Sequence, residues 1–188
     1  VHGTLHKALE KAVSLGYIRH NPADKPDLPK VQKAEIKPLA DSEMIAFLNA
    51  IKGHEYEAVY LVTLFTGMRE GEVLGLTWDC IDFKSGTITI KQQLQKVRGT
   101  GGEYILAPTK NGKSRIVAPA KYVMQILTRQ RKSQNEQRLK AGPAWSNPLD
   151  LVFTNSLGKN LCAQTVYLHF KKLAAEAGVP NARFHDLR

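Results

Sequence analysis

The pattern of apolar positions along the chain predicts a mainly helical protein. Apolar residues recur at helical spacing in four segments, residues 1–21, 41–51, 119–141 and 161–177. A fifth segment, residues 55–66, is apolar on nearly every side. A helix that is apolar all round is typical of the buried centre of a domain.

Three short runs carry β-branched residues that alternate with other residues, which is typical of strands. They are residues 86–90, 104–106 and 115–117. Asn111-Gly112 lies between the last two runs and favours a tight hairpin turn, which would place Lys110 on a hairpin. The sequence therefore predicts a mainly α fold with a small antiparallel β-sheet, of the α+β class.

Residues 23–38 interrupt the helical pattern with a series of prolines and lysines. This composition predicts a stiff, basic, proline-rich linker. One helix before a linker cannot bury its own apolar face, so we interpret residues 1–22 as the last helix of a preceding domain. Residues 39–188 are then one domain, long enough to bury a substantial core.

The stretch after the central helix contains a cation in an unusual position. Gly67 suits the left-handed turn that closes a helix, and a second helix is predicted to begin near Arg69 with Glu70 and Glu72 in its first turn. Carboxylates are favourable at this positive helix end, whereas a cation is not unless an anion lies in front of it. We interpret Arg69 as a ligand for an anion, best a phosphate. A solvated arginine paired with Glu72 is the alternative.

The charge of the chain favours a polyanionic partner. Lys and Arg number 27 against 17 Asp and Glu, a net charge of +10, and the basic residues are spread along the chain. This favours a folded basic surface for nucleic acid ahead of a membrane surface. No apolar run is long enough to span a bilayer. Cys80 and Cys162 lie outside any paired metal motif, which favours a reducing, intracellular setting.

The polar side of the helix predicted at 161–177 is a candidate contact with a DNA groove. Its candidate residues are Thr165, His169, Lys171 and Lys172. Ordinary solvent exposure of this side is the alternative. Near the end of the chain, His185 and Arg188 are three residues apart and would share one side of a helical turn. Imidazole and guanidinium together can clamp a phosphate and move a proton at neutral pH.

Two of these segments resemble the arginine boxes of the tyrosine recombinases, the integrase family of phages and conjugative transposons. The first is Thr66-Gly67-Met68-Arg69-x-x-Glu72-Val73-x-x-Leu76, and the second is His185-Asp186-Leu187-Arg188. Between them, Lys110 in its 108–115 context resembles the family's catalytic lysine, with Lys113 as its rival. The stretch Gly16-Tyr17-Ile18-x-x-Asn21-Pro22-Ala23 resembles the close of the family's core-binding domain, a DNA-binding domain.

The resemblance implies the tyrosine-recombinase catalytic-domain architecture and a site-specific strand exchange that needs no metal or cofactor. A tyrosine attacks a DNA phosphodiester and forms a 3′-phosphotyrosine. Arg69 and Arg188 would hold the non-bridging oxygens. Lys110 would protonate the leaving 5′-oxygen, and His185 would assist proton transfer or hold the phosphate. Glu72 matches the family's acidic position and would orient Arg69 or His185.

The resemblance also implies the partners and the setting. These are double-stranded attachment-site DNA, a tetramer of identical subunits on two duplexes, and the bacterial cytoplasm at the nucleoid, with no membrane. The family's nucleophilic tyrosine follows the second box, and none of the six tyrosines of this chain occupies that place. We therefore expect a catalytic domain truncated before its nucleophile, which binds DNA and assembles most of the phosphate pocket without cutting.

Two alternatives to a recombinase remain at this point. The first is a non-catalytic DNA-binding module derived from an integrase, which the missing nucleophile would suit. The second is a metal-dependent nuclease with Asp79 and Asp82 as ligands, although no His or further acid joins them at ligand spacing.

Overall fold

The computed structural model describes residues 2–24, 39–97 and 102–187, which belong to two compact units, Val1–Lys37 and Pro38–Arg188. In the first unit, α1 (His2–Ser14) contributes no buried residue. Asn21 ties the following turn to this helix, because its amide donates to the carbonyl of His6 at 3.1 Å and to Glu10 at 3.0 Å. That α1 closes a preceding domain stays a prediction.

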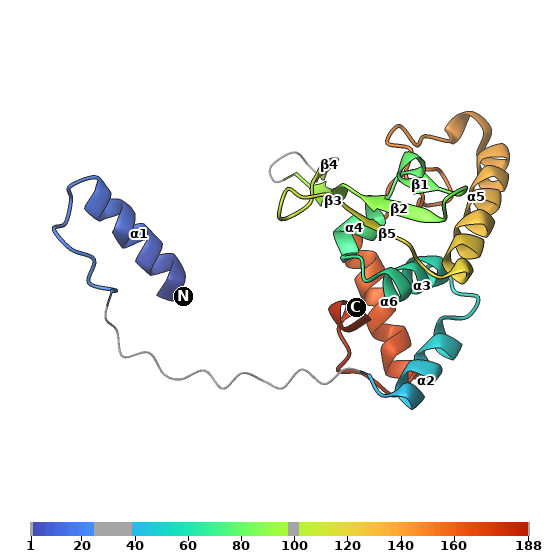
Figure 1. Cartoon of the computed structure of the whole chain (residues 1–188), viewed down its shortest axis with the longest axis horizontal. Coiled ribbons are helices and arrows are strands. Elements are labelled where there is room, and N and C mark those ends of the chain that lie inside the picture. Colours follow the sequence, from blue (N-terminus) through green and yellow to red (C-terminus); the bar gives the residue numbers. More distant parts are fainter. Residues whose placement is uncertain (1, 25–38, 98–101, 188) are drawn as a thin grey trace. The chain divides into compact units, whose positions relative to one another are not determined.

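Of the elements in the described ranges, the second unit contains most of the helices and all of the strands (Figure 1). Its helices are α2 (Asp41–Ile51), α3 (Glu57–Thr66), α4 (Glu70–Leu74), α5 (Lys121–Ala141) and α6 (Ala163–Glu176), with the 3-10 helices η1 (Trp78–Cys80), η2 (Gly142–Ala144) and η3 (Phe184–Leu187). Its strands are β1 (Ile81–Asp82), β2 (Thr87–Ile90), β3 (Gln92–Lys96), β4 (Tyr104–Pro108) and β5 (Arg115–Val117). Every helix in the described ranges is too short or too polar to cross a membrane.

Helix α3 is the buried centre of this unit, as the sequence predicted. Tyr60 of α3 is fully buried, and its hydroxyl donates to the carbonyl of Val166 on α6 at 2.9 Å. Three aromatic rings surround it at 6.1–6.2 Å between ring centroids, Phe47 of α2, Phe170 of α6 and Phe184 of η3. Three helical elements distant in the sequence are therefore packed around one side chain.

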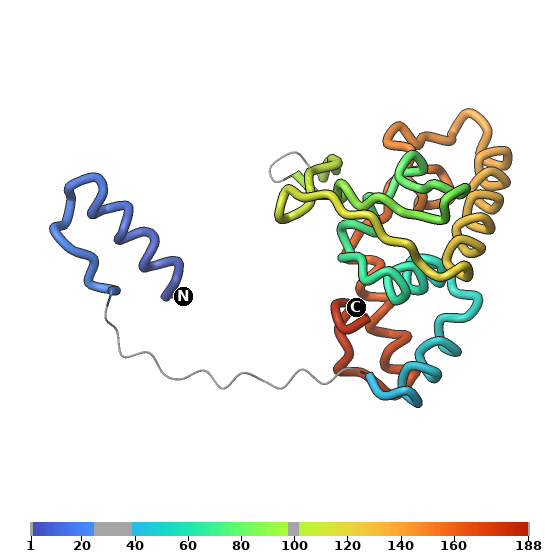
Figure 2. Tube along the Cα trace, viewed as in Figure 1, coloured from blue at the N-terminus to red at the C-terminus, as the bar shows by residue number. Residues whose placement is uncertain are grey.

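The strands form two small antiparallel sheets along one continuous ribbon. β2 leads through Lys91 into β3; β2 pairs with β1 and β5, and β3 pairs with β4. Ile90 is opposite Arg115 and Gln92 is opposite Pro108, so residues 109–114 form an excursion opposite Lys91 alone (Figure 2). We call residues 109–114 the lysine loop, because it carries Lys110 and Lys113.

The predicted hairpin between residues 104–106 and 115–117 was wrong in its pairing. Asn111-Gly112 does form a turn, since the amide of Gly112 donates to the carbonyl of Thr109 at 2.8 Å and Gly112 has φ 66°. The flanking strands β4 and β5, however, each pair with the ribbon formed by β2 and β3 and not with one another. Turn chemistry is local, whereas pairing is decided by the neighbouring strands.

Helix α4 lies directly against β3, which fixes the start of this helix relative to the sheet. A Cβ at Gly75, just after α4, would overlap the backbone nitrogen of Leu94 and lie 2.7 Å from the carbonyl carbon of Gln93. Gly75 has φ −94°, which any residue adopts, so glycine is required here for space. In the first turn of α4, a Cβ at Gly71 would lie 3.3 Å from the carbonyl oxygen of Leu94. Both ends of α4 are therefore close to β3, in the ribbon that pairs with the strands on either side of the lysine loop.

Candidate active site

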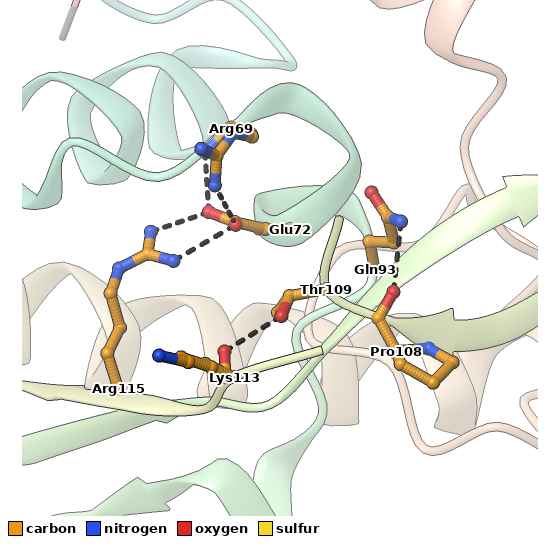
Figure 3. A network of polar contacts seen from close by, with 7 residues as sticks. All are labelled: Arg69, Glu72, Gln93, Pro108, Thr109, Lys113 and Arg115. Carbon is orange, nitrogen blue, oxygen red and sulfur yellow. Dashed lines mark hydrogen bonds and ion pairs between the residues drawn. The ribbon is translucent and has the colours of Figure 1, made fainter. Parts of the chain in front are cut away.

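Glu72 of α4 lies at the centre of a polar cluster, and its side chain is fully buried. Helix α3 ends at Gly67 in the left-handed conformation, and α4 begins with Arg69 as its N-cap residue. Glu72 closes the first turn, because one carboxylate oxygen accepts the backbone amide of Arg69 at 2.9 Å. Its other oxygen accepts a bond from the Arg69 guanidinium at 2.8 Å (Figure 3). The pairing of Arg69 with Glu72 that the alternative interpretation expected is therefore present, and the role of Arg69 as a ligand for an anion stays a prediction.

Arg115 of β5 binds the same carboxylate in a bidentate manner (Figure 3). Its Nη1 donates to Glu72 Oε1 at 3.0 Å, and its Nη2 donates to Glu72 Oε2 at 2.6 Å. The sequence predicts a strand at this arginine but no role in the site. A buried carboxylate requires compensating cations, but the sequence does not show which distant residue supplies the second one.

The cluster keeps Glu72 ionised and leaves a net positive charge. Burial alone would raise the pKa of Glu72, but the hydrogen bonds from Arg115 and Arg69 outweigh it and hold the pKa at about 2. Two guanidiniums and one carboxylate sum to +1, and the side chains of Arg69 and Arg115 are each 36% exposed. The net positive charge and the partly exposed Arg69 side chain suit an oxyanion such as a phosphate.

The lysine loop is directly connected to this cluster, because the loop ends at residue 114 and Arg115 is the next residue. Lys110 and Lys113 are both exposed, and the hydroxyl of Thr109 closes the loop by donating to the carbonyl of Lys113 at 2.8 Å. The side chain of Lys113 extends toward Arg115 in Figure 3. Both lysines therefore remain candidates for a proton donor near the guanidiniums.

The two residues of the predicted second box differ in what the structure describes. His185 is exposed on η3, between the buried Phe184 and the half-buried Asp186. Asp186 accepts hydrogen bonds from Arg183, the closest at 2.8 Å. Among the described residues, no hydrogen bond joins His185 to the Glu72 cluster. Arg188 lies outside the described residues, so its place in the site stays a prediction.

The four candidate DNA contacts on α6 do not form one accessible surface. Lys171 donates to the carbonyls of Pro180 and Ala182. His169 faces His54 at 3.1 Å between Nδ1 and Nε2. Thr165 and Lys172 are exposed. His169, Lys171 and Thr165, which hydrogen-bonds to Cys162, thus have partners within the domain, and Thr165 and Lys172 are exposed to a ligand.

The pair of His54 and His169 also bears on metal binding. The amide of Tyr56 donates to His54 Nδ1 at 3.1 Å, which places the proton of the neutral ring on Nε2, facing His169. Burial, followed by the neighbouring His169, lowers the pKa of His54 and favours this neutral form. A metal on Nε2 would require the proton on Nδ1, against the Tyr56 amide.

Asp79 and Asp82, the candidate metal ligands of a nuclease, both have partners within the fold. Asp79 forms an ion pair with Lys91 at 2.6 Å and accepts a hydrogen bond from Thr77. Asp82 accepts the backbone amides of Lys84 at 2.8 Å and Ser85 at 3.2 Å, which closes the turn after β1. These contacts favour the structural interpretation of both residues.

Comparison with known proteins decides the family. The sequence profile described as "Phage integrase family" matches residues 37–188. The chain belongs to the phage integrase family. A XerC-like tyrosine recombinase of Caldanaerobacter subterraneus subsp. tengcongensis is 31% identical over 193 residues, which cover 94% of this chain and 49% of that protein. An integrase of Streptomyces ambofaciens is 30% identical over 185 residues, covering 97% and 47%.

The fold of this phage integrase family member is that of solved integrases. The Tn1549 transposon integrase in complex with transposon right end DNA superposes with a TM-score of 0.80 at 20% identity, covering 99% of this chain and 62% of that one. A lambda integrase dimer bound to a core site gives 0.58 at 17% identity, covering 100% and 59%. The predicted family and α+β class are confirmed. The chain spans about half the length of the curated relatives it matches.

Five of the six tyrosines of this integrase-family chain belong to the second unit, which contains the Glu72 cluster. Among the described residues, no tyrosine hydroxyl bonds to Arg69, Glu72 or Arg115. Tyr60 is fully buried, and burial raises its pKa, which disfavours the nucleophilic phenolate. The hydrogen bond with Cys162 likewise raises the pKa of Tyr104. That none of the six tyrosines is the nucleophile stays a prediction.

Replacement of Glu72 by Gln tests the cluster through stability. The pKa of Glu72 is about 2 in the folded domain against an ordinary 4.5, so its ionised contacts stabilise the fold at neutral pH by roughly 3 kcal/mol. We expect Glu72→Gln to lower the free energy of unfolding by about 3 kcal/mol at pH 7 in urea titrations. As the pH falls from 4.5 to about 2, Glu72 becomes protonated in the unfolded chain while it is still ionised in the folded domain, so the stabilisation of the wild type is lost over this range. The difference from the variant therefore shrinks over that window.

Glu136→Gln is the matched control, since Glu136 is exposed on α5. Its free energy of unfolding should equal that of the wild type at pH 7 and at pH 3. A cost of Glu72→Gln that is equal at pH 7 and pH 3 would show that the charge of Glu72 does not carry the stabilisation.

Proposed function

We propose that this chain is part of a site-specific DNA recombinase that exchanges strands through a 3′-phosphotyrosine intermediate, without a metal. Support comes from the partly exposed side chain of Arg69, which is fixed with Arg115 on one buried carboxylate beside a loop with two lysines. A cationic site held by rigid elements suits a phosphodiester that gains charge in its transition state. The chain spans about half of its relatives, so the activity is proposed for the full-length protein.

The residues take the following roles in this proposal. Arg69 and Arg188 bind the non-bridging oxygens of the scissile phosphate, and two forked guanidiniums fix its geometry better than lysines would. Glu72 orients Arg69. Lys110, with Lys113 as its rival, protonates the leaving 5′-oxygen, and His185 assists proton transfer. The tyrosine nucleophile is expected in a part of the protein other than this chain.

The proposed partner is double-stranded DNA at an attachment site. The charge of +10 supports a polyanionic partner. Of the predicted contacts on α6, Thr165 and Lys172 are accessible to a duplex, whereas His169 and Lys171 have partners within the domain. We further propose a tetramer on two duplexes, acting on nucleoid DNA in the bacterial cytoplasm. A non-catalytic DNA-binding module is the alternative, and strand cleavage separates the two.

Replacement of Arg69 tests the phosphate role in the full-length protein. With a nicked attachment-site duplex that traps the covalent intermediate, we expect Arg69→Ala to lower the cleavage rate by about 10²–10³-fold. Arg69→Lys keeps the charge but loses the fork, so it should also cleave slowly. Binding to the duplex should change only a few-fold, because many other cations contact the backbone.

Arg129→Ala is the control for Arg69, since Arg129 is exposed on α5. It should cleave like the wild type. Normal cleavage by both Arg69 variants would overturn the phosphate role, and a wild-type protein that binds but never cleaves would favour the DNA-binding module.

A change of the leaving group in the substrate distinguishes the roles of Lys110 and Lys113. We expect Lys110→Ala to cleave at least 10²-fold more slowly, because the 5′-oxygen leaves poorly without a proton. A substrate with sulfur at the 5′-bridging position should restore the rate, since a thiolate leaves without protonation. Lys113→Ala should cleave both substrates like the wild type. The opposite result would assign the proton donor to Lys113. In that case Lys113→Ala would be slow, the sulfur substrate would restore its rate, and Lys110→Ala would cleave normally.

A further inference from the structure

Arg115 connects two parts of the proposed active site that are distant in the sequence. Its backbone is held in the sheet opposite Ile90, and its guanidinium lies on Glu72, 43 residues earlier in the chain. Both guanidinium contacts are short, 3.0 Å and 2.6 Å, and together they occupy both oxygens of the carboxylate. Arg115 therefore joins β5 to the first turn of α4.

The lysine loop is held at both of its ends. Before the loop, Pro108 pairs with Gln92, and the carbonyl of Pro108 accepts the side-chain amide of Gln93 at 3.0 Å. After the loop, Arg115 is fixed on Glu72. The distance from the loop to the Glu72 carboxylate is thus set by the residue next to the loop and not by a flexible connection.

The contacts of Arg69 show what Arg115 adds. Arg69 gives Glu72 its backbone amide and one guanidinium nitrogen, Nη1. The described residues offer no hydrogen-bond partner to its Nε and Nη2, so these donors are available to a ligand. A buried carboxylate without Arg115 would lose two charge-assisted bonds. It would then draw the Arg69 guanidinium into a bidentate pair and occupy the donors that a phosphate needs.

We propose that Arg115 is a positioning residue of the strand-cleavage reaction. By occupying both oxygens of Glu72, it lets Arg69 keep two donors for the scissile phosphate, and it ties the lysine loop to the same carboxylate. This inference rests on the proposed recombinase function. It differs from a direct phosphate contact, because Arg115 acts through Glu72 and loses its effect where Glu72 carries no charge.

The test is a double-mutant cycle in the full-length protein, with single-turnover cleavage of the nicked attachment-site duplex as the readout. We expect Arg115→Met to slow cleavage by about 10–100-fold at saturating protein, with DNA affinity within two-fold of the wild type. Arg115→Lys restores a charge but only one contact, so it should be slowed by about 3–10-fold. In a Glu72→Gln background, Arg115→Met should cause no further loss beyond two-fold.

Three outcomes would overturn the inference. Unchanged cleavage by Arg115→Met below its melting temperature would make Arg115 merely structural. A full additional loss in the Glu72→Gln background would mean that Arg115 contacts the phosphate itself, and a loss of DNA affinity without a loss of rate would make it a binding residue. Should Arg115→Met fail to fold, Arg115→Lys alone and with Glu72→Gln gives the same comparison.

Arg129→Met is the control and is expected to cleave like the wild type. It also separates this inference from the proposed function. If the wild type and Arg129→Met do not cleave, the recombinase proposal fails. If both cleave and Arg115→Met cleaves equally well, only the positioning role of Arg115 fails.

Discussion

The burial of one carboxylate, that of Glu72, is the constraint on which the site depends. An ionised group that is fully buried is tolerated only with hydrogen-bonded cations around it. Arg69 supplies two bonds from the same helix turn, and Arg115 supplies two from a strand 43 residues later. Removal of either arginine leaves a buried charge with too few partners. The carboxylate therefore forces α4 and β5 to meet, and two guanidiniums stay side by side despite their repulsion.

The rest of the fold makes this meeting possible. Gly67 ends α3 in a left-handed turn, which directs the chain into α4, and Gly75 lets α4 approach the backbone of β3. The ribbon of β2 and β3 then pairs with β4 and β5 on either side of the lysine loop. Tyr60 and the rings around it hold α2, α6 and η3 to α3, so the Arg69 turn starts from a helix at the buried centre of the domain.

Local features of the sequence were predictable, and long-range partners were not. The apolar run of α3, the closing glycine and the misplaced cation at Arg69 are all properties of one short stretch. The pairing of β4 and β5 with the ribbon depends on β3, which is Gln92–Lys96 with a single apolar residue and so gave no strand pattern. Arg115 looked like any strand residue, and the partners of His169 and Lys171 lie in loops that no periodicity connects to α6. Only the fold identifies which cation a buried carboxylate requires.

The match to the phage integrase family covers residues 37–188 and so includes all members of the Glu72 cluster. The most direct test of the central claim is a structure of the full-length protein on an attachment-site duplex. The account predicts one backbone phosphate within hydrogen-bond distance of Nε or Nη2 of Arg69, while Glu72 still accepts bonds from both Arg69 and Arg115. A complex in which Arg69 contacts no phosphate, or in which Glu72 has released Arg115, would contradict it.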